Sequence, residues 1–363
     1  MKTNGEPSGS VPKVGRPSVL AAEFRETIAQ LLEAAGAQNE RVYETVQPSL
    51  RPEGRHALAF PAGLAVTPSH LYVSDTAHHR VLECSHEGRI LRQFGSGNPG
   101  LLDGVAADCS FTAPRGLAVM KDMLYIADTG NHALRRVRLL SGEVDTLAGN
   151  GRPGEPSGTL SGPAENLPLN APWDVAGAFD KLYLSMAGTN QLWEFDLGKR
   201  SMQAIAGSGK LGLADGVGTF AQSAQPAGLA MVQQSLYVAD SAASAVRNLQ
   251  LANGVVQTLI GQGLYEFGDQ DGTRTAARLQ YPLALALDPR SPLLWILDTY
   301  NNAVKMLRLG GGDLRRYEIE YRLHQPAAIA ASRGALWIAN TDAHEVIRVD
   351  LDGGTVVRLP IGE

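Results

Sequence analysis

The sequence predicts an all-β protein built as a six-bladed β-propeller, and three observations support this prediction. A Leu-aromatic dipeptide recurs near the start of six short β-like runs: Leu71-Tyr72, Leu124-Tyr125, Leu182-Tyr183, Leu236-Tyr237, Leu294-Trp295 and Leu336-Trp337. A proline stands ten residues before five of these copies and twelve before the other: Pro61, Pro114, Pro172, Pro226, Pro282 and Pro326. The prolines recur at spacings of 53, 58, 54, 56 and 44 residues, with four strand-like runs per repeat, which is the plan of a propeller blade.

Residues 1–55 precede the repeats and are predicted to form a separate N-terminal extension, with the propeller over 56–363. Residues 1–17 are rich in Gly, Ser, Pro and Lys, which is typical of disorder. A short N-terminal helix is predicted over 18–36, with an apolar face made by Leu20, Phe24, Ile28, Leu31 and Leu32. A short strand over 41–46 is expected to pair near residues 355–359 and so close the ring, and residues 47–54 form a linker.

Each repeat has the same predicted order of strands. The first strand follows a Pro-x-Gly-Leu-Ala-Val pattern, as in residues 61–66, and its small residues suit the crowded axis of a propeller. The second is the Leu-aromatic strand, and two further strands follow, as in residues 80–83 and 89–94. We expect the Leu-aromatic pairs to fill the interfaces between blades, because one blade cannot bury its own apolar faces.

Composition narrows the classes of function. The net charge of −5 and the pI near 5.9 argue against a general nucleic-acid surface, which needs concentrated Lys and Arg. The two cysteines, Cys84 and Cys109, form no Cys-x-x-Cys motif, so no redox dithiol of that kind is expected. The N-terminus is polar, without the apolar region of a secretory signal, and no apolar run reaches the ~18 residues of a membrane span. We therefore expect a cytoplasmic protein.

The turn Asp128-Thr-Gly-Asn-His132 after a second strand resembles the repeat that defines the NHL-repeat β-propellers, and the resemblance extends over residues 60–350. Irregular pieces such as Pro172-Trp-Asp174 and Met186-Ala-Gly-Thr189 are similar to those of the thioredoxin-linked NHL-repeat proteins. In those relatives a thioredoxin-like domain usually precedes the propeller, and none is predicted in this sequence. The resemblance therefore implies that any redox activity would come from a separate thioredoxin-like partner.

The turn after the second strand carries acids and histidines at fixed positions. The strand-ending position holds Asp75, Asp128, Met186, Asp240, Asp298 and Asn340. Acids there are expected to stabilise the turn by accepting backbone N–H bonds. The later turn position holds His79, His132, Asn190, Ser244, Asn302 and His344. Zinc binding is the alternative for the three histidines, but their spread over several blades disfavours one shared ion.

Glycine-rich segments also repeat along the chain. Three fit the pattern G-x-G-x-x-G, at residues 95–100, 149–154 and 207–212, but each follows a fourth strand and no helix follows it. We interpret them as exit turns. The Asp-Gly pairs at 103–104, 215–216 and 271–272 are likewise interpreted as turns, because the acid that an EF-hand calcium loop requires downstream of residues 269–272 is missing.

The candidate site lies where the repeats differ at the expected channel mouth. After the proline, four repeats carry small or aliphatic residues: Ala62, Ala227, Leu283 and Ala327. The second repeat has Arg115, and the third has Trp173 and Asp174. A cation, an indole and a carboxylate on neighbouring blades predict a ligand- or partner-binding site. The alternative is an Arg115–Asp174 ion pair that locks two blades, with Trp173 as packing.

Three further residues join the candidate site. Met186 replaces a strand-ending acid, and His79 and His132 occupy the turns of the first two repeats. The sequence contains no Walker A, His-Glu-x-x-His or Gly-x-Ser-x-Gly motif. No catalytic residue, metal site or cofactor is therefore predicted.

The expected function is a non-catalytic scaffold that binds a protein or small molecule at its loop-rich face. The alternative is a metal-dependent enzyme of the lactonase, hydrolase or lyase type, with its site at the channel mouth. Fold alone does not carry that function, and only Asp174 is well placed to be a ligand. RNA binding is a third alternative, which the acidic balance disfavours.

Overall fold

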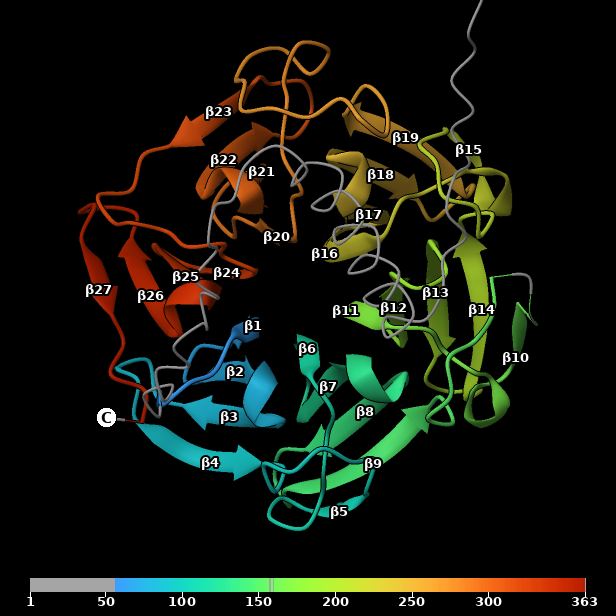
Figure 1. The fold of residues 1–363 in the computed structure, drawn as a ribbon, viewed down its shortest axis with the longest axis vertical. Helices are drawn as coiled ribbons and strands as arrows, with labels where there is room; N and C mark the ends of the chain where they lie inside the picture. The colour runs from blue at the N-terminus through green and yellow to red at the C-terminus, as the bar shows by residue number, and fades with distance from the viewer. Residues whose placement is uncertain (1–55, 157, 159, 363) are drawn as a thin grey trace, which may run out of the picture. The chain divides into compact units, whose positions relative to one another are not determined.

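The computed structural model describes residues 56–156, 158 and 160–362, which form six antiparallel sheets around a central axis (Figure 1). The predicted six-bladed β-propeller is therefore confirmed. The predicted disordered start, the helix over 18–36 and the strand over 41–46 lie outside the described residues. None of the short helices in the described part of the chain has the length and apolar character needed to cross a membrane.

Each blade runs outward from the axis in chain order. The strands of blades 1 to 3 are β1 (Pro61–Val66), β2 (Leu71–Asp75), β3 (Arg80–Cys84) and β4 (Ile90–Phe94); β6 (Pro114–Met120), β7 (Met123–Asp128), β8 (Ala133–Arg138) and β9 (Glu143–Ala148); and β11 (Pro172–Ala178), β12 (Lys181–Met186), β13 (Gln191–Asp196) and β14 (Ser201–Ala206). Those of blades 4 to 6 are β16 (Pro226–Val232), β17 (Ser235–Asp240), β18 (Ala245–Gln250) and β19 (Val255–Ile260); β20 (Ala284–Leu287), β21 (Leu293–Asp298), β22 (Ala303–Arg308) and β23 (Leu314–Tyr317); and β24 (Ala328–Ser332), β25 (Ala335–Asn340), β26 (Glu345–Asp350) and β27 (Val356–Arg358).

Blades 2, 3 and 4 carry a fifth strand, so the expectation of four strands in every repeat is corrected. The added strands are β5 (Gly104–Val105), β10 (Ser161–Pro163) and β15 (Gly216–Val217), each at the outer edge of its sheet. Each lies in the loop before the first strand of its own blade, because that loop returns along the outside of the sheet. In blade 5 the same return makes only an isolated bridge, between Gly272 and Leu314.

The Leu-aromatic pairs fill the blade interfaces, as predicted. Leu124 packs in a cluster with residues of blade 1, whereas Tyr125 packs with residues of blade 3. Adjacent strand residues point to opposite faces of a sheet, so one dipeptide serves two interfaces. Both side chains are almost completely buried, and burial of such side chains contributes roughly 1.5–3 kcal/mol each.

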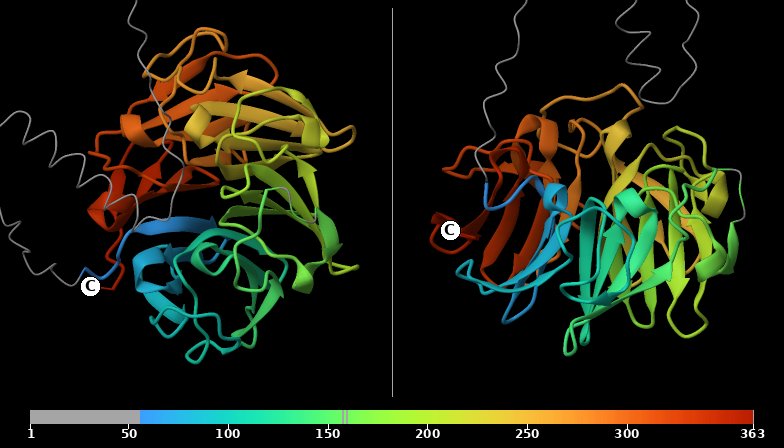
Figure 2. Two further views of the ribbon diagram at one scale, coloured as in Figure 1. Left: turned by 45° about the vertical axis from the view of Figure 1, so that its right-hand side comes forward. Right: turned by 60° about the horizontal axis from the view of Figure 1, so that its bottom comes forward.

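The ring closes by packing between blades 1 and 6, which lie side by side in the further views (Figure 2). Trp337 of blade 6 and Leu71 of blade 1 belong to one buried cluster. The Thr341 hydroxyl donates to the carbonyl of Pro61 over 2.8 Å. Among the described residues, β27 pairs with β26, and the predicted partner strand over 41–46 lies outside them.

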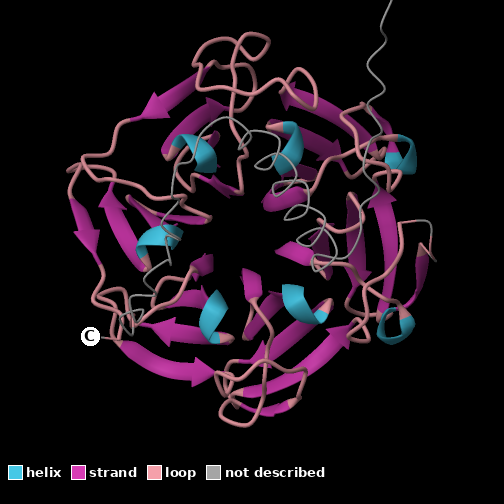
Figure 3. Cartoon of the chain, in the orientation of Figure 1, coloured by secondary structure: helices cyan, strands magenta, loops and turns pink. Residues whose placement is uncertain are grey.

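Short 3-10 helices follow the second strand in five blades, near the axis (Figure 3). They are η1 (Thr76–His78), η2 (Thr129–Asn131), η5 (Ser241–Ala243), η6 (Thr299–Asn301) and η7 (Thr341–Ala343). Two more, η3 (Ala164–Asn166) and η4 (Gly218–Phe220), lie in the loops between blades. The glycine-rich segments are turns, as interpreted: Gly149 and Gly151 both have positive φ, and no helix begins directly after Gly154.

Candidate functional site at the channel mouth

The predicted turn position contacts the next blade in every repeat. Its six residues all have left-handed backbone conformations, and each accepts the backbone N–H of the residue before the next blade's proline. That residue is left-handed too, a strained conformation for a non-glycine residue. The distances are 2.6–3.2 Å for the pairs Ala113–His79, Ala171–His132, Gln225–Asn190, Tyr281–Ser244, Gln325–Asn302 and Phe60–His344.

Three side chains of one turn thus form what we call the turn clamp, defined in blade 2 by Asp128, Thr129 and His132. The Asp128 carboxylate accepts the N–H of Thr112 over 2.8 Å. The Thr129 hydroxyl donates to the carbonyl of Pro172 in blade 3 over 2.7 Å, and His132 Nδ1 accepts the N–H of Ala171 over 2.9 Å. Thr129 and His132 fix the entry of the next blade, whereas Asp128 holds the entry of its own blade. The turn acid thus has a structural role, but the backbone N–H that it accepts belongs to Thr112 and not to the turn itself.

Buried cations balance several of these acids. Arg135 is fully buried between Asp128, at 3.0 Å, and Asp103, at 2.9 Å. Arg247 repeats the arrangement in blade 4, with carboxylates of Asp240 and Asp215. Asp103 and Asp215 belong to the predicted Asp-Gly turns. Each therefore has a second role, because it is the second carboxylate that pairs with the buried arginine of its blade.

His79 and His132 act as hydrogen-bond acceptors between blades. An Nδ1 that accepts a backbone N–H belongs to a neutral imidazole with its proton on Nε2. Burial lowers the pKa of His132, which favours this neutral form. Within the described residues, no three His, Cys, Asp or Glu side chains are grouped so that they could hold a metal ion.

Blade 3 departs from the turn clamp. Met186 and Ala187 stand where blade 2 has Asp128 and Thr129, and only the acceptor Asn190 is kept, over 2.8 Å from the N–H of Gln225. Met186 is buried in a hydrophobic cluster with Trp193. The structure therefore does not bring Met186 together with Arg115 and Trp173.

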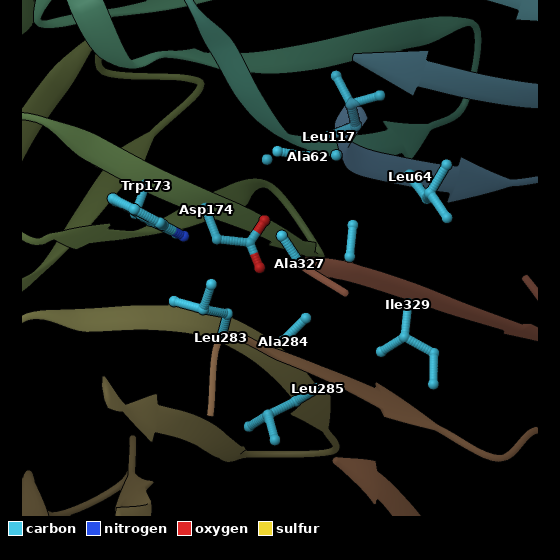
Figure 4. A pocket seen from close by; sticks show the side chains of 13 residues that line it. Ala62, Leu64, Leu117, Trp173, Asp174, Leu283, Ala284, Leu285, Ala327 and Ile329 are labelled. Atoms are coloured by element: carbon cyan, nitrogen blue, oxygen red, sulfur yellow. The ribbon is translucent and has the colours of Figure 1, made fainter. Parts of the chain in front are cut away.

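The axial channel holds a small pocket whose lining side chains are mostly apolar (Figure 4). The free volume of this pocket is about 30 Å³, close to the volume that one water molecule occupies in the liquid. The first strands of five blades line it, with Leu64, Leu117, Leu283, Leu285 and Ile329 among the lining side chains. Asp174 supplies the ionisable group of this lining, and its carboxylate points into the channel.

Asp174 is held by backbone donors. Its carboxylate accepts the N–H of Val175 and, from blade 4, the N–H of Leu229, both over 2.8 Å. Gly116 makes room for this carboxylate, because a Cβ on Gly116 would lie 2.2 Å from Asp174 Oδ1. Burial raises the pKa of Asp174 to about 7, although the two N–H bonds oppose the rise.

Arg115 stacks on Trp173 and does not pair with Asp174. The guanidinium carbon lies 4.1 Å from the centre of the indole ring, a cation–π contact between blades 2 and 3. The alternative of an Arg115–Asp174 ion pair is therefore wrong, because backbone N–H groups of Val175 and Leu229 occupy the Asp174 oxygens. Arg115 is half-buried, and burial lowers its pKa.

Three residues that sequence reasoning missed complete the mouth. Tyr281 donates its hydroxyl to Gln225 over 2.6 Å and stacks on Tyr300, with ring centres 4.7 Å apart. Burial and Tyr300 raise the pKa of Tyr281, and the Arg115 charge opposes that rise, so the two groups interact across the mouth. We call Arg115, Trp173, Gln225, Tyr281 and Tyr300 the mouth cluster. Gln225 and Tyr281 directly precede the prolines of repeats 4 and 5, which was the available signal.

Several curated proteins are similar to this chain in sequence. NHL repeat-containing protein 2 of Homo sapiens is 32% identical over 351 residues, which cover 84% of this chain and 48% of that protein. Protein SUPPRESSOR OF QUENCHING 1, chloroplastic, of Arabidopsis thaliana is 32% identical over 327 residues, covering 82% of this chain and 31% of that protein. The chain thus spans half or less of the length of these relatives. No protein-family model matches the sequence.

Solved structures share the fold at low sequence identity. A streptogramin B lyase structure matches with a TM-score of 0.55 and 12% identity, covering 84% of each chain. A chain of a nidogen/laminin complex matches with a TM-score of 0.55 and 14% identity, covering 80% of this chain and 92% of that one. One is named as an enzyme and the other as a protein complex, so this likeness concerns the fold alone.

Proposed function

Because the chain belongs to the NHL-repeat β-propellers, we propose that it is a non-catalytic binding module with the mouth cluster as its site. The occupant is a protein partner or a small molecule at the loop-rich face. Concave sites that combine aromatic walls with a few polar groups are typical of ligand binding.

The observation that carries this proposal is the state of Arg115. Arg135 and Arg247, the buried arginines of blades 2 and 4, each pair with two carboxylates. Among the described residues, the Arg115 guanidinium contacts the Trp173 ring but has neither an ion pair nor a hydrogen bond. The N–H groups of Arg115 are not among the buried unpaired polar atoms of the described residues, so they are open to solvent and available to a ligand.

The test compares what immobilised protein retains from a cell extract, quantified by mass spectrometry. Arg115→Gln and Trp173→Leu are expected to lose the retained proteins or metabolites while the melting temperature stays nearly unchanged. Arg89→Gln is the matched control, because Arg89 is an exposed arginine of blade 1, away from the mouth cluster. Retention that survives both mouth variants would sink the proposed site.

A thioredoxin-like redox partner is part of the proposal. Its support is the state of the two thiols: Cys84 and Cys109 are free and buried, and burial raises the pKa of Cys84 to about 12. Such thiols are poor nucleophiles, so a dithiol would have to come from elsewhere. Reduced thiols also fit the expected cytoplasmic location. Copurification of a thioredoxin-like protein, absent with Arg115→Gln, is the expected result.

The metal-dependent enzyme finds less support in these residues. It needs several side chains that converge on one channel ion. The channel lining offers Asp174, whose oxygens already accept two backbone N–H groups. Elemental analysis of protein purified without chelator separates the functions, since a stoichiometric divalent metal would favour the enzyme.

A further inference from the structure

We propose that the group recognised by the mouth cluster is a carboxylate, bound edge-on by the guanidinium of Arg115. This inference rests on the proposed function and deepens it, because it names the chemistry of the occupant. It is carried by the orientation of Arg115, by the charges around it and by the small pocket in the channel below.

The stacked guanidinium is prepared for a planar anion. The guanidinium carbon lies over the Trp173 ring, 4.1 Å from its centre, so the indole supports the guanidinium from one side. The N–H donors lie in the guanidinium plane, so the stack leaves them free to point sideways. A carboxylate in that plane accepts two parallel N–H bonds, the bidentate geometry that arginine matches better than lysine does.

The charges at the mouth match one negative charge. Arg115 is the single formal cation of the mouth cluster, and the Tyr281 hydroxyl already donates its hydrogen bond to Gln225. The carboxyl group of Asp174 accepts the backbone N–H groups of Val175 and Leu229 and does not pair with Arg115, so the Arg115 charge stays available. A phosphate dianion would need further cations, whereas a carboxylate monoanion is balanced by Arg115 alone.

The small volume of the channel pocket limits the size of any part of the occupant that could enter it. The pocket in the channel, with about 30 Å³ between side chains such as Leu283, does not admit a chain of several atoms. The occupant therefore covers the mouth instead of threading the channel. Tyr300 is 50% exposed and stacked on Tyr281, so this pair offers a flat apolar surface at the mouth. An apolar or aromatic group next to the carboxylate fits that surface.

Two sources supply this chemistry: a small aromatic acid, or the C-terminal carboxylate of a peptide. The probes are benzoate with benzamide as its neutral twin, and a short peptide ending in Phe with its C-terminally amidated twin. Inorganic phosphate is the third anion. Binding is measured by Trp fluorescence and by chemical-shift changes of the intact chain.

At least one acid is expected to bind, with its neutral twin and phosphate weaker by at least about tenfold. Arg115→Gln should weaken the acid by a similar factor, Arg115→Lys should restore part of the loss, and Arg89→Gln should change nothing. Preference for benzoate assigns a small-molecule source, and preference for the peptide acid assigns a protein source.

Two outcomes would overturn the inference. If a neutral twin binds as tightly as its acid, or if the acids bind Arg115→Gln as tightly as the wild type, the mouth cluster does not recognise a carboxylate. If Arg115→Gln still abolishes retention from extract in that case, the proposed site stands and only its ligand chemistry falls. If retention is also unaffected, both fall. Unchanged circular dichroism and melting temperature of Arg115→Gln exclude loss of folding as the cause.

Discussion

The junction between blades 2 and 3 and the junction between blades 3 and 4 are built differently. The first carries the full turn clamp of Asp128, Thr129 and His132. At the second, Met186 and Ala187 replace the acid and the threonine, and Asp174 in the channel strand bridges to the N–H of Leu229 over 2.8 Å. The first junction is thus held by three side chains of the turn, and the second by one turn side chain, Asn190, together with Asp174 in the channel.

This difference separates the residues that assemble the ring, which we call the frame, from those that form the candidate site. Turn clamps recur with the repeat, so their residues are explained by ring assembly. Blade 3 is the blade in which the clamp is reduced, and it is also the blade that supplies Trp173 to the mouth cluster. The departures from the frame, at Arg115, Trp173 and Asp174, lie together at one end of the channel.

Removal of a frame acid should give the largest loss of stability. Asp128→Ala leaves the fully buried Arg135 with Asp103 as its remaining carboxylate, so we expect a loss of about 3 kcal/mol or more in the free energy of unfolding. Met186→Leu, at the same repeat position of blade 3, should cost under about 1.5 kcal/mol. Urea unfolding measures both, and equal small losses would remove the distinction between the junctions.

The channel bridge of blade 3 should respond to pH. The pKa of Asp174 is raised from 3.8 to about 7, so the folded state holds a proton that the unfolded state has released between these values. Stability from this group is therefore present at low pH and is lost as pH rises through about 7, by up to roughly 1.4 kcal/mol per pH unit.

Asp174→Asn cannot titrate, so its stability relative to the wild type should increase from about pH 5 to about pH 7 and then level off. Denaturant unfolding of both proteins across this range is the measurement. A difference that stays constant with pH would show that Asp174 keeps its charge when folded.

The missing hydroxyl of blade 3 offers a reciprocal exchange. Thr129→Val removes the bond to the carbonyl of Pro172 and should cost about 0.5–1.5 kcal/mol. Ala187→Thr adds a hydroxyl at the corresponding turn of blade 3 and should stabilise the ring by a similar amount. Melting temperatures test both variants, and a destabilised Ala187→Thr would mean that the turn of blade 3 does not accept the clamp.

The smallest effect is expected at His132. Burial lowers its pKa below 6.5, and a protonated Nδ1 cannot accept the N–H of Ala171. Its contribution is therefore complete above about pH 6.5 and is lost as pH falls through the lowered pKa. His132→Asn, which copies Asn190 of blade 3, should remove this acid sensitivity, worth about 1 kcal/mol or less. Identical unfolding of both proteins at pH 5 and pH 7 would contradict this role.

The repeat made most of the frame predictable from the sequence. Leu124 and Tyr125 mark two interfaces because neighbouring strand residues face opposite ways, and that rule needs no tertiary information. Trp173 and Asp174 could be recognised as exceptions because the other repeats carry Pro-x-Gly or small and aliphatic residues at these positions. Met186 was placed wrongly in the site, because a missing acid looks the same in sequence whether the position faces the mouth or the core.

The partners within the site were less predictable. Arg115 and Asp174 lie on strands with different irregularities, since the register shifts between Pro172 and Asp174 in one and between Pro114 and Leu117 in the other. Arg115 stands one residue after its proline and Asp174 stands two after its own, so Arg115 meets its equivalent Trp173, and Asp174 lies against Gly116. Tyr281 of blade 5 interacts electrostatically with Arg115 of blade 2, a pairing that no spacing along the chain encodes.

The most direct test of the account measures stability and retention on two variants side by side. Arg115→Gln should keep the melting temperature of the wild type and lose the molecules retained from extract. Thr129→Val should lower the melting temperature and keep the retained molecules. A melting temperature of Arg115→Gln as low as that of Thr129→Val, or retention by Arg115→Gln equal to that of the wild type, would contradict a binding role for Arg115.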